Sequence, residues 1–164
     1  MKRILITFAA VAASLALAAC GDDTEEHDLT FTTDAIEVEA IDEGDSGSSR
    51  GDLRAFTQEL HEEGSDEPVG RLDGTVAITD VTDLEGTEVE YRMGSIQYTL
   101  DDGTIVATGN YIAEPGEAVP YEGGVERAIV GGTGDYEGAS GVTTQTADGD
   151  SDWVYELEFT TPSE

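Results

Sequence analysis

The feature that most limits the fold of this chain is the alternation of apolar and polar residues in short runs. Near the C-terminus, four apolar residues share one face of an extended stretch, and mostly polar residues share the other; the apolar four are Trp153, Tyr155, Leu157 and Phe159. Successive side chains of a β-strand point to opposite faces. This stretch therefore predicts a strand with one face buried and the other in water.

Similar runs recur along the chain, rich in β-branched and aromatic residues, and no stretch keeps a helical period. Eight short antiparallel strands can close into a barrel, which removes exposed sheet edges and leaves a lumen filled by side chains or wide enough for one small ligand. The sequence predicts an all-β fold, an eight-stranded antiparallel β-barrel, with a β-sandwich as the competing architecture. The predicted strands are residues 35–41, 53–60, 75–81, 88–100, 105–113, 127–130, 142–147 and 153–160.

The first nineteen residues predict an export signal. Lys2 and Arg3 precede an apolar run that ends in the small residues of Leu17-Ala18-Ala19-Cys20. A helix that spans a membrane needs about 20 apolar residues, whereas this run is shorter and is followed at once by Gly21-Asp22-Asp23. The pattern favours a cleaved signal peptide over a spanning helix.

The Leu-Ala-Ala-Cys run resembles the lipobox of lipoproteins, in which the cysteine is lipidated and becomes the first residue of the mature chain. The alternative is a plain secretory signal followed by a free cysteine. Cys20 is the one cysteine in the sequence, so a disulfide within the chain is excluded. Acyl groups such as palmitate contribute about 0.8 kcal/mol per buried methylene. We therefore expect an exported protein anchored at the outer face of the cell membrane by lipid on Cys20.

Composition divides the chain into a signal peptide at 1–19, an acidic tether at 20–34 and a β-barrel domain at 35–164. The tether prediction rests on the many carboxylates and few apolar residues of 20–34, which cannot form a core. The formal net charge is −30. Such a surface repels nucleic acid and anionic lipid headgroups, so we expect no nucleic-acid partner and a surface suited to salty surroundings.

Neither the carboxylates nor the histidines indicate a metal site. The acidic runs Glu43-Gly44-Asp45-Ser46 and Asp148-Gly149-Asp150-Ser151-Asp152 lack the spacing of an EF-hand calcium loop, and hairpin turns explain them better. His27 and His61 each stand alone in an acidic stretch, where we expect them to be solvated. We expect no metal and no cofactor.

A glycine-rich segment, 128–141, contains Gly131-Gly132-Thr133-Gly134. A phosphate-binding loop would have to open a helix, but here the strand-like run Val142-Thr143-Thr144-Gln145-Thr146 follows. The glycines therefore predict tight turning between two strands.

The residues of this segment and of three earlier runs resemble the allene oxide cyclase and dirigent-protein superfamily. The resemblance covers about residues 50–160 and is carried, in order, by Gly51-Asp52-Leu53 with Phe56 and Leu60, Val69-Gly70-Arg71-Leu72-Asp73-Gly74, Gly103-Thr104-Ile105 with Gly109-Asn110-Tyr111-Ile112, and the GGTG run with Tyr136 and Ala139-Ser140-Gly141. It implies an eight-stranded barrel with a largely apolar cavity, commonly assembled as a homotrimer.

Two departures from that superfamily concern residues that carry its chemistry. Plant cyclases have a Glu-x-Asn pair on the first strand, where the nearest counterpart here is Ala40-Ile41-Asp42. Dirigent proteins have an arginine in the Ala-Arg-Gly run after the GGTG segment, where this chain has Ala139-Ser140-Gly141.

The barrel leads to two functional hypotheses. The preferred one is a lipoprotein that binds a small apolar molecule in its lumen, lined by Tyr111, Trp153 and Tyr155. The alternative is an isomerase or cyclase that holds an apolar substrate for ring closure in a water-poor cavity. Its candidate catalytic residues are Asp42 as acid or base, with Tyr91 and Asn110 orienting the ligand. For each residue the competing interpretation is barrel packing or exposure, because strand register decides which face it takes.

A third possibility is a glycan-binding module. It would need exposed aromatic platforms, and a single tryptophan within an alternating pattern gives it little support.

Overall fold

The computed structural model describes residues 24–34, 38–41, 47–117, 123–148 and 152–163, and the regular elements in these ranges are all β-strands. The strands are β1 (Thr24–Thr33), β2 (Val38–Ile41), β3 (Leu53–Glu62), β4 (Pro68–Leu84), β5 (Thr87–Leu100), β6 (Gly103–Ala113), β7 (Val125–Gly134), β8 (Ser140–Asp148) and β9 (Asp152–Pro162).

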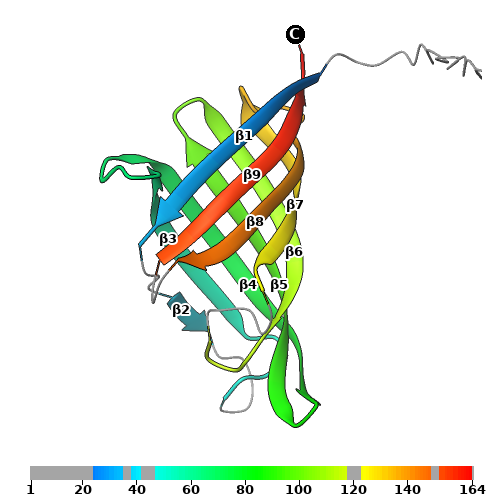
Figure 1. Ribbon diagram of the computed structural model, residues 1–164. Coiled ribbons are helices and arrows are strands. Elements are labelled where there is room, and N and C mark those ends of the chain that lie inside the picture. Colours follow the sequence, from blue (N-terminus) through cyan, green and yellow to red (C-terminus); the bar gives the residue numbers. More distant parts are fainter. Residues whose placement is uncertain (1–23, 35–37, 42–46, 118–122, 149–151, 164) are drawn as a thin grey trace, which may run out of the picture.

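The strands form one antiparallel sheet that curls into a closed barrel (Figure 1). Neighbours follow the order β1-β9-β8-β7-β6-β5-β4-β3, and β1 returns to β3 through the pairs Phe31↔Glu62 and Thr32↔His61. The short strand β2 pairs with the beginning of β3, and β1 pairs with the end of β3. The two strands therefore lie along the same edge of β3. The predicted eight-stranded antiparallel barrel is confirmed, and closure excludes the sandwich.

The prediction of a tether over residues 20–34 is wrong for Thr24–Thr33, which forms β1 and pairs with β9 over its whole length. The acidic residues Glu26 and Asp28 point to solvent, while Leu29 and Phe31 point inward and Phe31 is buried. Acidic composition hid an alternating strand, because one face of a barrel strand is free to carry charge. His27 is likewise half-buried: its ring stacks on Phe159 with 4.8 Å between centroids, and its Nε2 lies 2.8 Å from the Thr161 hydroxyl.

Strand β4 begins at Pro68, earlier than the predicted start at residue 75. The predicted start was too late because Gly70, Asp73 and Gly74 resemble strand breakers in the sequence. The structure gives Gly74 a packing role. The ring of Phe56 lies over it, and a Cβ atom at this position would sit 2.1 Å from Phe56 Cζ. Glycine is required there because two strands and a ring meet at close range.

A tight turn at Asp101-Asp102-Gly103 joins β5 to β6, and Asp148 at the end of β8 pairs with Asp152 at the start of β9. The β7–β8 turn uses glycines with positive φ, 66° at Gly134 and 77° at Gly138, which confirms the turning role of the glycine-rich segment. The long β4–β5 hairpin extends beyond the barrel (Figure 1).

Candidate functional site

The lumen has an apolar section that side chains fill. Each of its principal residues is at most 5% exposed: Phe31, Leu60, Leu72, Tyr98, Ile105, Trp153, Tyr155 and Leu157. They come from six different strands and form one continuous core. At this level the barrel is a packed interior, as small barrels commonly are.

Five polar side chains lie in this core and hydrogen-bond to one another in two separate sets. The Tyr98 hydroxyl lies 2.8 Å from that of Thr143, and the Tyr155 hydroxyl donates to Gln58 Oε1 at 3.3 Å. Gln58 in turn donates to Thr33 Oγ1 at 2.8 Å, which ties β3 to β1 at the closing seam. Burial raises the pKa of Tyr98 and of Tyr155 above the ordinary tyrosine value. Both phenols therefore stay protonated at neutral pH.

A cluster of charged side chains occupies the next section of the lumen, toward the start of β5. Glu90 is fully buried, and each of its oxygens meets an arginine: Arg54 Nη2 lies 3.0 Å from Oε1, and Arg92 Nε lies 2.6 Å from Oε2. The Ser48 hydroxyl also donates to Oε1. Arg92 further donates to the backbone carbonyls of Glu117 and Glu114 at 2.7 and 3.1 Å, which fixes the segment after β6 against the barrel.

Arg127, on β7, completes this charged section. It is 3% exposed, and its Nη1 donates to Gln145 Oε1 at 2.9 Å. Its Nε is buried and has no hydrogen-bond partner among the described residues. Burial lowers the pKa of the guanidinium from its ordinary value. The ring of Tyr111 lies beside both Arg92 and Arg127, with 5.6 Å from each guanidinium carbon to the ring centroid. We call Arg54, Glu90, Arg92, Tyr111 and Arg127 the polar cluster.

Solvent reaches the lumen at the polar cluster. Tyr111 shares the inward face of its strand with buried neighbours, yet it keeps intermediate exposure, and the Arg54 side chain is 17% exposed. By contrast Leu72, Tyr98 and Tyr155, farther along the lumen, are 0% exposed. A small molecule therefore meets aromatic surface and hydrogen-bonding groups together at this end of the barrel.

The structure separates the predicted site residues into three groups. Tyr111, Trp153 and Tyr155 point into the lumen, as the lining prediction requires, although contact with a ligand stays a prediction. Tyr91 is 37% exposed, and Asn110 is exposed as well; both lie on the outer surface, so they do not reach the lumen. Asp42 and Cys20 lie outside the described residues. The three arginines and Glu90 of the polar cluster were not among the predicted site residues.

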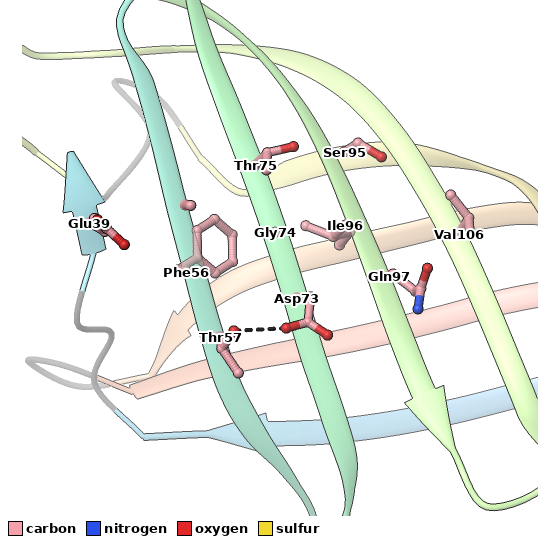
Figure 2. A pocket seen from close by; sticks show the side chains of 11 residues that line it. Glu39, Phe56, Thr57, Asp73, Gly74, Thr75, Ser95, Ile96, Gln97 and Val106 are labelled. Atoms are coloured by element: carbon pink, nitrogen blue, oxygen red, sulfur yellow. Dashed lines mark hydrogen bonds between the residues drawn. The ribbon is translucent and has the colours of Figure 1, made fainter. Parts of the chain in front are cut away.

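A groove of about 990 Å³ lies on the outer face of β2–β6 (Figure 2). Most of its lining side chains point away from the lumen, including Thr57, Asp73, Thr75, Ser95 and Gln97, and Phe56 and Ile96 also border it. The Thr57 hydroxyl donates to Asp73 at 2.7 Å, and Arg71 pairs with the same carboxylate at 2.8 Å. The groove is open, and the carboxylate of Asp73 within it is held by Thr57 and Arg71.

No helix in the described ranges has the length and apolar character needed to cross a bilayer. In the same part of the chain, no group of three or more His, Cys, Asp or Glu side chains is arranged to hold a metal ion.

Comparison with known proteins gives matches in structure. No protein-family model and no curated protein sequence matches the chain. A pyocyanin demethylase matches with a TM-score of 0.64 and 26% identity, over 81% of this chain and 99% of that one. A pterocarpan synthase dirigent protein matches with a TM-score of 0.60 and 15% identity, over 94% of this chain and 100% of that one. The chain has the barrel fold of the dirigent proteins.

The same dirigent-type barrel occurs in enzymes that form rings. The Diels–Alderase of Streptomyces koyangensis matches with a TM-score of 0.61 and 13% identity over 84% of this chain, which spans 64% of that protein. The superfamily resemblance drawn from the sequence is thus confirmed at the level of the fold. These neighbours are named for reactions of small organic molecules, and they have in common a barrel that shapes such substrates.

Proposed function

We propose that this protein binds a small, largely apolar, ring-containing organic molecule in the lumen, at the polar cluster. The observation that carries the proposal is the half-buried aromatic ring of Tyr111 beside the buried hydrogen-bonding groups of Arg92 and Arg127 in one interior section. Ligand sites in proteins combine an apolar lining with a few placed polar groups in this way.

The structural neighbours support this ligand class. The demethylase is named for pyocyanin, a planar aromatic heterocycle, and it is the neighbour with 26% identity. The dirigent proteins are named for pterocarpan synthesis, and a further neighbour is a heme-binding cyclase that catalyses a [4 + 2] cycloaddition. Flat or fused ring systems are therefore the first molecules to test.

Binding without turnover is favoured over catalysis by the state of the polar groups. Both oxygens of Glu90 already accept hydrogen bonds from arginines, and Ser48 donates to one of them, so this carboxylate is held by groups of the protein itself. Tyr98 and Tyr155 are protonated and already hydrogen-bonded. The described lumen supplies positioning groups and offers no free general base.

The fluorescence of Trp153 provides a direct test. It is the single tryptophan of the chain, it points into the lumen and it is 5% exposed. Titration of the purified protein with pyocyanin is expected to quench its emission in a saturable manner, because a planar acceptor in the lumen lies close to the indole. Free tryptophan in the same titration corrects for absorbance by the dye.

Two variants assign the quenching to the lumen. Tyr111→Ala removes the aromatic ring of the site and is expected to weaken binding, whereas Val130→Ala shortens an exposed side chain on the outer surface and leaves binding unchanged. If pyocyanin and uncharged aromatic probes such as methyl 2-naphthoate all failed to give saturable quenching, the proposal would be wrong.

The alternative is that the same lumen folds an apolar substrate for ring closure. The cyclase neighbours favour this reading, since orientation alone lowers the barrier of an intramolecular reaction. Ring closure by isomerisation gives a product of unchanged mass. Chromatography of a bound polyene before and after incubation therefore separates a cyclase, which yields a new peak of equal mass, from a binding protein, which returns its ligand.

Export and lipid anchoring on Cys20 remain part of the proposal. Strand β1 begins at Thr24, so at most three residues separate it from Cys20, a reach of about 10 Å when extended. Thr24 pairs with Pro162, at the opposite end of the strands from the polar cluster. The lipid would hold that end against the membrane and leave the polar cluster facing away. Mass spectrometry of the protein, with Cys20→Ser as control, tests for the acyl groups.

The resemblance also suggests a homotrimer, which we propose as the assembled state. Sedimentation of the purified protein in detergent tests it, and a monomer over a wide range of concentrations would contradict it.

A further inference from the structure

The charges inside the barrel do not balance. The chain has a net charge of −30 and only five arginines after position 19, yet three of them, Arg54, Arg92 and Arg127, lie in the polar cluster. Among the described residues, Glu90 is the carboxylate that contacts these arginines, and it is shared between Arg54 and Arg92. The cluster therefore carries a net positive charge in the interior of a strongly acidic protein.

Arg127 holds the uncompensated charge. It is 97% buried, its Nη1 is bonded to the neutral amide of Gln145, and its Nε has no partner among the described residues. A buried guanidinium without an anion is costly, and an unsatisfied charged donor adds to that cost. Proteins rarely keep such a group without a use for it.

The backbone leaves space beside this donor. Gly94 and Gly109 pair with each other across β5 and β6, on the lumen face next to Arg127. A Cβ atom on Gly94 would lie 3.8 Å from Arg127 Nε, and one on Gly109 would lie 2.9 Å from Arg127 Cγ. Glycine at these two positions therefore makes room for the arginine stem, and neither position places a side chain against Nε.

The geometry points to Arg127 as the anchor for an acidic oxygen, a carboxylate or a phenolate, on the ring-containing ligand of the lumen. The free Nε donor faces this oxygen, and the half-buried ring of Tyr111 beside the guanidinium packs against the apolar body of the ligand. An arginine is suited to this task because it donates several hydrogen bonds in a fixed plane to an oxyanion. This inference rests on the proposed lumen site and specifies the charge of its ligand.

The test compares two probes that differ in one charge, 2-naphthoate and its neutral methyl ester, by calorimetric titration of the purified full chain. The protein is expected to bind the anion at least about tenfold more tightly than the ester, against the repulsion of its own surface charge. Arg127→Met should abolish this preference, so that the variant binds the two probes with equal affinity. Arg71→Met is the matched control, because Arg71 is exposed on the outer face and its loss changes the net charge equally.

Thermal unfolding without ligand supplies a second reading. Arg127→Met is expected to be at least as stable as the parent protein, since it removes a buried charge that lacks a counter-ion. A strong loss of stability would identify Arg127 as a structural residue and overturn the inference. Equal affinity for the two probes, or an unchanged preference in Arg127→Met, would overturn it while leaving the lumen site intact. Failure of both probes to bind would count against the lumen site itself.

Discussion

Glu90 is the residue on which the polar cluster depends for its stability. It is fully buried and serves Arg54, Arg92 and Ser48 at once. We predict that Glu90→Ala lowers the free energy of unfolding by about 3–5 kcal/mol, because the buried Arg92 would lose its counter-ion. Urea denaturation measures this loss. The control is Glu88→Ala, an exposed carboxylate on the same strand, for which a change below about 0.5 kcal/mol is expected. Equal effects of the two substitutions would contradict the prediction.

At the same scale, the sequence identified the aromatic part of the lumen but not its charged part. Trp153 and Tyr155 lie in a strand whose alternation never changes phase. On β5 the apolar residues change phase: Tyr91 and Met93 occupy one face early in the strand, and Ile96 and Tyr98 occupy the other face later. The structure keeps the second face inward throughout, so Glu90 and Arg92 are buried while Met93 is 52% exposed. The change of phase in the apolar alternation near Gly94 was the one sequence signal for a charged interior. It predicts the burial of Glu90 and Arg92 only once the barrel fold is known.

At the scale of elements, β1 closes the barrel, since it bridges β9 and β3. We predict that Phe31→Ala destabilises the protein by about 3–5 kcal/mol, because it opens a cavity in the core beside Tyr98. Thr30→Ala, at an exposed neighbouring position, is the control and should be nearly neutral. Thermal unfolding of both variants tests the assignment, and a neutral Phe31→Ala would restore the tether interpretation for this segment.

Deletion of residues 24–33 is expected to have a different consequence from a point substitution. It would leave the edges of β9 and β3 unpaired, and exposed edges associate with other chains. The shortened protein should therefore elute from a sizing column as oligomers or aggregates.

The sequence could not predict β1 from composition, because its acidic residues suggested disorder. The alternation of Leu29 and Phe31 with polar residues was too short to outweigh the charge.

At the scale of the whole molecule, the closed barrel was predictable because apolar and polar residues alternate cleanly in most strands and tight turns separate them. Which charged side chains stand opposite one another on the surface depends on strand register, which only the structure reveals. Asp28 stands directly opposite Glu158 on the outer face of β1 and β9, and both are exposed. Like charges in such cross-strand pairs are destabilising. With a net charge of −30, this repulsion acts over much of the surface.

Salt should therefore stabilise the fold. The screening length falls from about 10 Å at 0.1 M to about 3 Å at 1 M ionic strength, so the urea midpoint is expected to rise over this range of sodium chloride. Glu158→Gln distinguishes screening from a general salting-out effect. It removes the repulsion from Asp28, so it should stabilise the protein at low salt, by up to about 1 kcal/mol, and the gain should vanish at 1 M. A gain that is the same at both salt concentrations would show that the carboxylate destabilises the strand for a reason other than its charge.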